Sequence, residues 1–202
     1  MTISVMLADD QALVRGALAA LLDLETDLHV VAEVGRGDEV VEAALKEQPD
    51  VVLMDVEMPG MDGIAATAAL KAQLPGVHVL IVTTFGRPGY LRRGLQAGAD
   101  GFVVKDTPAR ELANAVRRVH QGLRVVDPAL ATDSLVAGES PLTERETQVL
   151  RSALDGGTVA DIAREHFLSE GTVRNHLSSA IGKTGARTRA EAARIAVDNG
   201  WL

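Results

Sequence analysis

Five polar side chains stand where apolar segments of the chain end, and their types could do chemistry together. Asp9 and Asp10 follow the run I-S-V-M-L-A, and Asp55 follows V-V-L-M. Thr83 ends H-V-L-I-V-T, and Lys105 ends G-F-V-V-K. An ionised carboxylate at the end of a buried strand has a high free energy unless a cation or hydrogen-bond donors meet it. Asp55 is therefore either capping a turn or taking part in a reaction.

The apolar segments that end on these residues alternate with helical patterns. Strand-like runs recur every 20 to 27 residues, which is too far apart for hairpins and typical of βα units, and they cover residues 3–8, 29–34, 51–54, 78–83 and 101–105. Helical periodicity lies between them, near residues 11–22, 37–47, 63–73, 88–96 and 108–121. We predict an α/β domain over residues 1–121, with a doubly wound parallel sheet ordered 2-1-3-4-5.

This strand order brings the acidic residues into one crevice, because strands 1 and 3 are neighbours whose connections leave in opposite directions. Asp9, Asp10 and Asp55 then converge, and three carboxylates repel one another unless a cation is bound. Mg²⁺ fits, since it takes one or two carboxylates, waters and a phosphate. FMN in the same crevice is disfavoured, because the aspartates would face its phosphate without a Ser/Thr loop to receive it.

The remaining strand ends complete a site for phosphoryl transfer. Thr83 offers a hydroxyl, and Lys105 offers an ammonium that can neutralise charge on Asp55 or on a phosphoryl group attached to it. An aspartate can act as a nucleophile toward phosphoryl donors, and such transfer needs mostly positioning and charge neutralisation. Alone, a strand-end Asp is more often a cap and a strand-end Lys is usually solvated. Their joint placement at four of five strand ends favours the reactive site, whereas Asp50 and Asp62 are predicted to be structural.

Composition excludes several other kinds of protein. The chain has 202 residues, 47% of them hydrophobic, and no cysteine, so disulfides, thiolate metal sites and cysteine nucleophiles are excluded. No uncharged apolar window approaches the ~18 residues that cross a bilayer. We therefore predict a cytoplasmic protein without a membrane partner.

A second, helical domain is predicted after a linker. Periodicity fades between residues 123 and 140, and we predict a linker over residues 122–139 and a small all-α domain over residues 140–202. Thr143 and Glu146 have capping-box spacing at the start of its first helix, and further helices follow near residues 158–166, 170–183 and 188–199.

The last part of the chain has the pattern of a helix-turn-helix. The segment D-I-A-R-E-H, F-L-S, E-G-T-V-R-N-H-L predicts two helices and a tight turn, with Ser169 as the N-cap of the second helix. Val173 and Leu177 would face the bundle. Residues 1–122 carry 17 acidic and 11 basic residues, whereas residues 171–194 carry five basic residues and one acid. This local positive charge at a helix-turn-helix favours DNA binding over a merely solvated face.

The N-terminal motifs resemble the receiver domain of two-component response regulators, a flavodoxin-like (βα)5 fold. The motifs are A-D-D at 8–10, L-M-D-V-E-M-P-G-M-D-G at 53–63, T-T at 83–84 and A-G-A-D-G-F-V-V-K-D at 97–106. The resemblance implies that Asp55 accepts a phosphoryl group from a sensor histidine kinase. It also implies a Mg²⁺ site and a switch: the metal ligands are Asp10, Asp55 and the Glu57 carbonyl, with Asp9 assisting through water, and the switch residues are Thr83, Phe102 and Lys105. Phe102 holds a position that is often Tyr in relatives, so it has no hydroxyl for an outward hydrogen bond.

The C-terminal segment resembles the LuxR-type helix-turn-helix domain of the NarL/FixJ subfamily. The resemblance and the helix pattern together predict contacts with double-stranded promoter DNA from Thr172, Arg174, Asn175, His176, Ser178, Lys183 and Arg187. Arg189, like Lys183 and Arg187, is a candidate for phosphate contacts, and His176 is equally well explained as a helix-packing residue. His166 and Thr184 stand where relatives usually have Leu, and Gly182 lies inside the second helix.

The chain is thus interpreted as a transcriptional response regulator and not an enzyme, with phosphorylation controlling homodimerisation or release of the DNA-binding domain. One alternative is a phosphatase with an aspartyl-phosphate intermediate, using Asp55 and Glu57 in place of a D-x-D pair. The lack of a substrate lid or cap domain disfavours it. A purely protein-binding adaptor is the other alternative, and DNA-binding measurements distinguish it.

Overall fold

The computed structural model of the protein describes residues 2–84, 88–137 and 140–202. The chain divides into two compact units, an N-terminal unit that extends to residue 131 and a C-terminal unit that follows it. Two core clusters lie in the first unit, and a third lies in the second. No helix in the described part of the chain combines the length and the apolar character needed to cross a bilayer.

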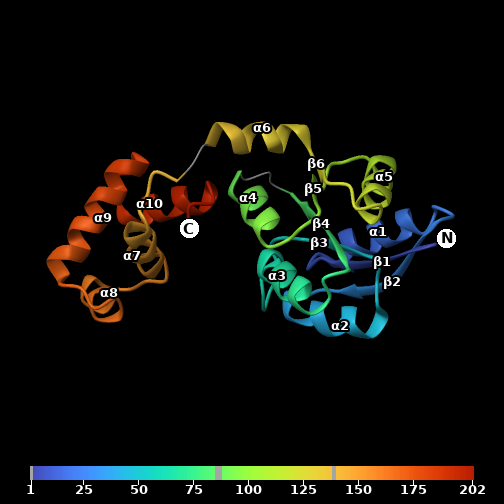
Figure 1. Ribbon diagram of the computed structural model, residues 1–202, viewed down its shortest axis with the longest axis horizontal. Helices are drawn as coiled ribbons and strands as arrows, with labels where there is room; N and C mark the ends of the chain where they lie inside the picture. Colours follow the sequence, from blue (N-terminus) through green and yellow to red (C-terminus); the bar gives the residue numbers. More distant parts are fainter. Residues whose placement is uncertain (1, 85–87, 138–139) are drawn as a thin grey trace. The chain divides into compact units, whose positions relative to one another are not determined.

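A parallel six-stranded sheet forms the centre of the N-terminal unit, with the order β2-β1-β3-β4-β5-β6 (Figure 1). Its strands are β1 (Ile3–Ala8), β2 (Leu28–Val34), β3 (Val51–Met54), β4 (His78–Thr83), β5 (Gly101–Val104) and β6 (Val125–Val126). The predicted flavodoxin-like fold and the order of its first five strands are confirmed. The predicted strand number is wrong by one, because β6 extends the sheet beyond β5.

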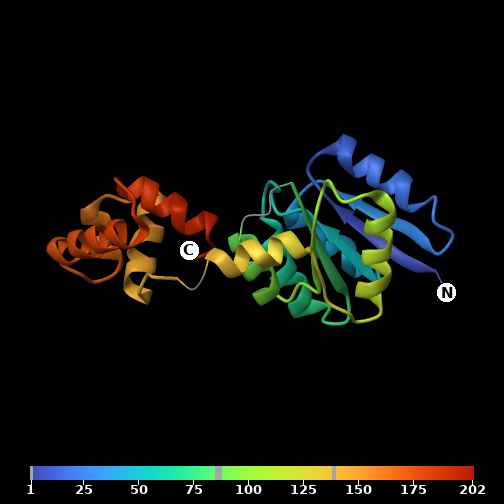
Figure 2. The ribbon, with the colours of Figure 1, turned by 90° about the horizontal axis from the view of Figure 1, so that it is seen from above.

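Helices cover both faces of this sheet (Figure 1 and Figure 2). One face packs against α1 (Ala12–Leu22) and α5 (Ala109–His120). The other face packs against α2 (Val40–Glu47), which follows the short η1 (Gly37–Glu39), and against α3 (Gly63–Gln73) and α4 (Pro88–Gln96). Every residue of β3 is buried because both of its faces are covered, and this explains why its sequence is a continuous apolar run.

The turn that follows β3 is built from residues with defined local roles. The side chain of Asp62 accepts a hydrogen bond of 2.8 Å from the backbone N–H of Ala65 and caps α3. A Cβ atom on Gly63 would lie 1.8 Å from the carbonyl oxygen of Asp55, so no other residue fits at this position without moving the backbone. The start of α3 is thus held directly against the end of β3.

The segment predicted to be a linker contains a strand and a helix among its described residues. Strand β6 pairs with β5, and the backbone N–H of Asp127 donates a hydrogen bond of 3.0 Å to the carbonyl oxygen of Phe102. Helix α6 (Pro128–Ala137) then begins with a proline, which suits the first helical turn because it has no N–H to satisfy there. The Asp127 side chain accepts a hydrogen bond of 2.8 Å from the N–H of Ala129.

In its described residues, the C-terminal unit after α6 is a bundle of α7 (Glu144–Leu154), α8 (Val159–Glu165), α9 (Glu170–Thr184) and α10 (Arg189–Asp198). Each of these helices begins with a hydroxyl N-cap, namely Thr143, Thr158, Ser169 and Thr188. The predicted capping box and the predicted Ser169 cap are therefore confirmed, as is the burial of Val173 and Leu177.

Candidate functional site

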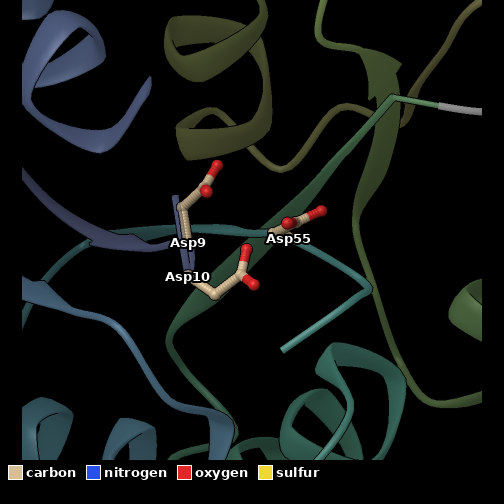
Figure 3. A group of neighbouring side chains, drawn as sticks. All are labelled: Asp9, Asp10 and Asp55. Carbon is tan, nitrogen blue, oxygen red and sulfur yellow. The ribbon is translucent and has the colours of Figure 1, made fainter. Parts of the chain in front are cut away.

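Three carboxylates meet at the carboxyl ends of β1 and β3 (Figure 3). One carboxylate oxygen from each of Asp9, Asp10 and Asp55 lies within 4.8 Å of the other two. Asp9 and Asp55 are each only 4% exposed, whereas Asp10 is exposed at the rim. The strand order therefore brings together the three side chains that the sequence predicted to converge.

Lys105 joins two of these carboxylates. Its ammonium nitrogen lies 2.6 Å from Oδ2 of Asp9 and 2.9 Å from Oδ2 of Asp55, and its side chain is 8% exposed. Burial acts to lower the pKa of Lys105, but the hydrogen bonds to the two carboxylates outweigh burial and raise it above its ordinary value. Burial also raises the pKa of Asp55, and the neighbouring Asp9 adds to this effect while Lys105 opposes it.

Backbone hydrogen bonds fix the two buried aspartates. The N–H of Asp55 donates to the carbonyl oxygen of Ala8 at 2.8 Å, and the N–H of Val56 donates to Oδ1 of Asp55 at 2.8 Å. The Asp9 carboxylate accepts from the N–H of Gln11 at 2.9 Å, and the Asp9 carbonyl accepts from Arg15 at 2.6 Å. These bonds leave Oδ2 of each carboxylate directed at Lys105.

The donor set fits a hard divalent cation. One ammonium shared by two buried carboxylates, with a third carboxylate beside them, leaves excess negative charge at the crevice. The three side chains of the cluster offer carboxylate oxygens, which suit Mg²⁺ rather than Zn²⁺, an ion that prefers nitrogen and sulfur ligands. Exposure of Asp10 leaves one side of the cluster open to waters or to a phosphate.

The predicted switch residues lie on β4 and β5 or, for Lys105, directly after β5. Thr83 is 2% exposed at the end of β4, and its carbonyl oxygen accepts a hydrogen bond of 2.7 Å from the N–H of Lys105. Phe102 is fully buried in the core between the sheet and its helices. A backbone hydrogen bond therefore joins the two strand ends that carry Thr83 and Lys105.

Sequence reasoning missed one residue at this site. Tyr90 on α4 is 8% exposed, and its hydroxyl donates a hydrogen bond of 3.2 Å to Oε1 of Glu57, two residues after Asp55. Glu57 was predicted as a metal ligand through its backbone carbonyl, and its exposed side chain takes part in this separate contact. The only sequence signal is that Tyr90 is the single tyrosine of the chain.

In the C-terminal unit, α9 presents most of the predicted DNA-contacting residues on its solvent side. Arg174, Asn175 and Ser178 are exposed, whereas Thr172 and His176 are half-buried. Arg174 donates to the carboxylate of Glu170 at 2.6 Å, one turn earlier on the helix. Such exposed pairs are weak, so the Arg174 side chain can leave its partner for a nucleic acid at a small free-energy cost.

Lys183 has a packing contact in addition to its predicted role at phosphates. Its ammonium donates to Oε2 of Glu146 on α7 at 2.7 Å, and Ser179 donates to Oε1 at 2.7 Å. Burial acts to raise the pKa of Glu146, but these donors and the capping contacts with Thr143 lower it to about 2. Arg187 is exposed, and its backbone N–H donates to Glu191 at 2.8 Å.

His166 and Thr184, which stand where relatives usually have Leu, have hydrogen-bond partners within the bundle. A ring nitrogen of His166 lies 2.8 Å from the hydroxyl of Ser152 on α7, and the hydroxyl of Thr184 donates to the carbonyl oxygen of Ala180 at 2.8 Å. Gly182 is exposed within α9, and a Cβ atom there would meet nothing within 4 Å. The polar substitutions are therefore accommodated by hydrogen bonds that stay inside the bundle.

Comparisons with known proteins cover both units. Residues 5–117 match the response regulator receiver domain family, and residues 140–196 match the luxR family of bacterial regulatory proteins. Two relatives from Bacillus subtilis (strain 168) are similar over the whole chain. The transcriptional regulatory protein DesR is 43% identical over 99% of each chain, and the uncharacterized transcriptional regulatory protein YvfU is 44% identical over 99% of this chain and 100% of its own.

A solved structure has the same two-part organisation. The crystal structure of the response regulator ChrA, from a heme-sensing two-component system, has 33% sequence identity and a TM-score of 0.61, and the match covers 100% of this chain and 99% of ChrA. The receiver match contains the whole acidic cluster and its lysine, and the luxR match contains α9. Because both halves match in this order, the chain belongs to the LuxR-type two-component response regulators, which are transcription factors controlled by phosphorylation.

Proposed function

We propose that Asp55 is the residue that accepts the phosphoryl group, and that a phosphorylated histidine of a sensor kinase is its donor. The observation that carries this assignment is the environment of the Asp55 carboxylate. It is buried at a strand end, bonded to the Lys105 ammonium at 2.9 Å, and within 4.8 Å of the two other carboxylates. This is the combination of nucleophile, fixed cation and metal-binding oxygens that phosphoryl transfer requires.

In the proposed reaction, a carboxylate oxygen of Asp55 forms a bond to phosphorus while the bond from phosphorus to the donor's imidazole nitrogen breaks. The electron pair of that bond stays on the imidazole, which takes a proton from solvent. Lys105 neutralises charge on the transferred group, and the Thr83 hydroxyl is proposed to turn toward it. Asp10, Asp55 and the Glu57 carbonyl, with Asp9 assisting through water, would hold Mg²⁺, which would supply further neutralisation of the phosphoryl oxygens.

Incubation of the full chain with acetyl phosphate and Mg²⁺ tests this assignment. We expect the intact mass to increase by one phosphoryl group, and peptide mapping to place it on Asp55. EDTA is expected to prevent the reaction, because without the cation only Lys105 offsets the negative charge of the three carboxylates and of the incoming phosphoryl group. A phosphoryl group on any other residue, or equal labelling in EDTA, would contradict the proposal.

The DNA contacts of the C-terminal unit are the second part of the proposal. We propose that Arg174 and Asn175 contact base edges of promoter DNA while Lys183, Arg187 and Arg189 contact phosphates, since the second helix of such a motif lies in the major groove. Lys183 would have to exchange its contact with Glu146 for a phosphate. Each chain supplies one helix-turn-helix, so we propose that a phosphorylated homodimer reads two half-sites.

An Arg174→Ala variant is expected to bind a specific promoter fragment more weakly by about 1–3 kcal/mol and to lose discrimination against mutated half-sites. Arg187→Ala is expected to weaken specific and non-specific binding alike and to reduce the salt slope by about one unit. Fluorescence anisotropy at several salt concentrations measures both effects. Arg110→Ala, an exposed change on α5 of the receiver domain, is the control. Unchanged affinity and slope in both the Arg174→Ala and the Arg187→Ala variant would favour the adaptor alternative.

A further inference from the structure

A cavity of about 400 Å³ lies at the edge of the sheet that is opposite to Asp55. It is lined by residues 48–50 before β3, by residues 74–78 up to the first residue of β4, and by His120 at the end of α5. The strands are parallel, so the amino ends of β3 and β4 share one edge of the sheet, while Asp55 and the acidic cluster lie at the other edge. The residues that line the cavity have no role in the proposed phosphoryl transfer.

Two histidines line this cavity side by side. His78 is the first residue of β4 and His120 is the last residue of α5, and the centroids of their rings lie 6.5 Å apart with an angle of 72° between the ring planes. Nδ1 of His78 is buried and makes no hydrogen bond in the described part of the chain, and Oδ1 of Asp100 lies 3.6 Å from it. The side chain as a whole is 26% exposed, so its accessible part is the rest of the ring. With its proton on Nδ1, toward Asp100, a neutral His78 has a lone pair on Nε2 that is available to a ligand.

Asp50 supplies a carboxylate to the same cavity. Its Oδ2 accepts hydrogen bonds from the backbone N–H of Ser4 at 2.8 Å and from the Ser4 hydroxyl at 2.7 Å. Burial acts to raise the pKa of Asp50, but these hydrogen bonds and the nearby His120 and His78 lower it below its ordinary value. The carboxylate is therefore ionised at neutral pH. Both Ser4 donors act on Oδ2, and Oδ1 is the oxygen that can serve a further partner.

The neighbouring carboxylate, Asp100, has a different environment. Its Oδ2 accepts from the ammonium of Lys71 at 2.7 Å and from the backbone N–H of Val79 at 2.8 Å. Lys71 thus compensates the charge of Asp100 and would repel a cation placed beside it, which favours the side of the cavity where Asp50 lies. A carboxylate next to the far nitrogen of a ligating histidine orients the ring and raises its basicity. Asp100 is placed to do this for His78.

We propose that His78 and His120, with Asp50 as the third ligand, form a site for a divalent transition-metal ion that prefers nitrogen ligands, such as Zn²⁺. Two imidazoles and one carboxylate, with water in the remaining position, are a donor set that such an ion takes. The acidic cluster at the other edge of the sheet offers only carboxylate side chains, which suit Mg²⁺. The receiver domain would thus bind two chemically different cations at opposite edges of one sheet.

Formation of the site requires only a small movement of the two rings. Zn²⁺ lies about 2.0–2.1 Å from a ligating nitrogen, so two imidazoles on one tetrahedral ion have centroids about 5 Å apart. His78 and His120 would approach each other by on the order of 1 Å from their present separation, which their partial exposure allows. The bound ion would join the end of α5 to the start of β4. Because the unfolded chain does not hold these ligands together, the ion is expected to raise the thermal midpoint of the receiver domain.

The first experiment identifies the ligands by NMR in the full chain, with the ring nitrogens of its five histidines labelled with ¹⁵N. Excess Mg²⁺ is present so that Zn²⁺ does not bind at the acidic cluster. We expect one equivalent of Zn²⁺ to shift the ring signals of His78 and His120 and to leave those of the other three histidines in place. Each signal is assigned by its loss in a single His→Gln variant, and the two ligands can also be assigned by elimination. Unshifted ring signals of His78 and His120 would overturn the proposal and show that the two rings only pack edge to face.

The second experiment measures zinc affinity by isothermal titration calorimetry in the same excess of Mg²⁺. His78→Gln and His120→Gln are each expected to weaken zinc binding by about tenfold or more, because the amide does not replace the imidazole nitrogen as a ligand. Asp50→Asn, which can still accept from Ser4, is expected to weaken it as well. His29→Gln is the matched control: His29 also lies beside a carboxylate, 3.3 Å from Asp23, but it is on β2 and outside the cavity.

Circular dichroism of each variant shows whether a loss of affinity comes with a loss of fold, and the NMR titration of the wild type does not depend on any variant. Equal zinc affinity in the wild type and in a chain carrying both His78→Gln and His120→Gln would contradict the site. Because Asp55 takes no part in the binding, a failure of labelling by acetyl phosphate would bear on the assignment of Asp55 and not on this site.

Discussion

An Asp55→Asn variant is expected to accept no detectable phosphoryl group from acetyl phosphate or from a phosphorylated kinase. The amide that replaces the carboxylate is neutral and is a poor nucleophile, while its size and its hydrogen bond from Val56 can be retained. Phos-tag gels and intact-mass spectrometry measure the loss. This is the largest effect expected of any single substitution in the receiver domain, because no other side chain can replace the attacking oxygen.

Two comparisons separate this loss from unfolding. Asp62→Asn changes a carboxylate in the same turn that caps α3, and it is expected to leave phosphorylation intact.

The pKa of Asp55 is raised by burial, so the folded state binds its proton more tightly than the unfolded state and ionisation at neutral pH destabilises the fold. Asp55→Asn removes this penalty, and its thermal midpoint is expected to equal or exceed that of the wild type. Labelling that persists in Asp55→Asn would show that the acceptor lies elsewhere.

A Glu146→Gln variant is expected to destabilise the DNA-binding domain by on the order of 2 kcal/mol at pH 7. Glu146 is buried and accepts hydrogen bonds from Lys183, Ser179 and the backbone N–H of Thr143. The amide keeps the volume of the side chain but loses its charge and presents a donor to the Lys183 ammonium. Urea unfolding of this domain is measurable through the single tryptophan, Trp201, which packs against its core.

The pH dependence of this effect has a defined sign. The pKa of Glu146 is about 2 in the folded chain and has a reference value of 4.5, so the stability that its charge contributes is present above about pH 4.5. This contribution is lost as the pH falls from about 4.5 toward 2. The difference in free energy of unfolding between the wild type and Glu146→Gln is expected to shrink over the same interval. Glu144→Gln, an exposed change in the same helical turn, serves as the control. A difference that stays constant down to pH 2 would contradict the ionic role of Glu146.

The fold was predictable where neighbouring residues determine structure. The apolar run before Asp55 predicts a strand buried on both faces, and β3 has the predicted bounds. The capping box of Thr143 and Glu146 is likewise local, since both partners lie within one helical turn. The convergence of Asp9 with Asp55 followed from strand order, because carboxyl ends of neighbouring parallel strands must share one edge of the sheet.

Other features depend on partners that the sequence does not place together. Strand β6 has two residues, and it is a strand only because it pairs with the edge of β5. Helix α6 combines apolar residues without a clear periodic face, so its pattern did not distinguish it from a linker. The contacts between Tyr90 and Glu57 and between Lys183 and Glu146 join residues 33 and 37 positions apart, and no spacing rule connects them. The contact between Lys183 and Glu146 shows that a basic residue on a predicted DNA-binding helix can also stabilise the packing of that helix against α7.

The pairing of β6 with β5 determines how the receiver domain can be isolated or fused to another output module. A fragment that stops at residue 121 would lack β6 and leave the backbone groups of β5 unpaired along an apolar edge. Such an edge is a template for strand addition between copies, so a fragment of that length invites aggregation. Because the backbone N–H of Asp127 donates to the carbonyl oxygen of Phe102, any chimaera that joins the receiver to a new output module also keeps this backbone contact at its junction. The peptide that follows α5 is therefore a paired strand of the sheet and not a free linker.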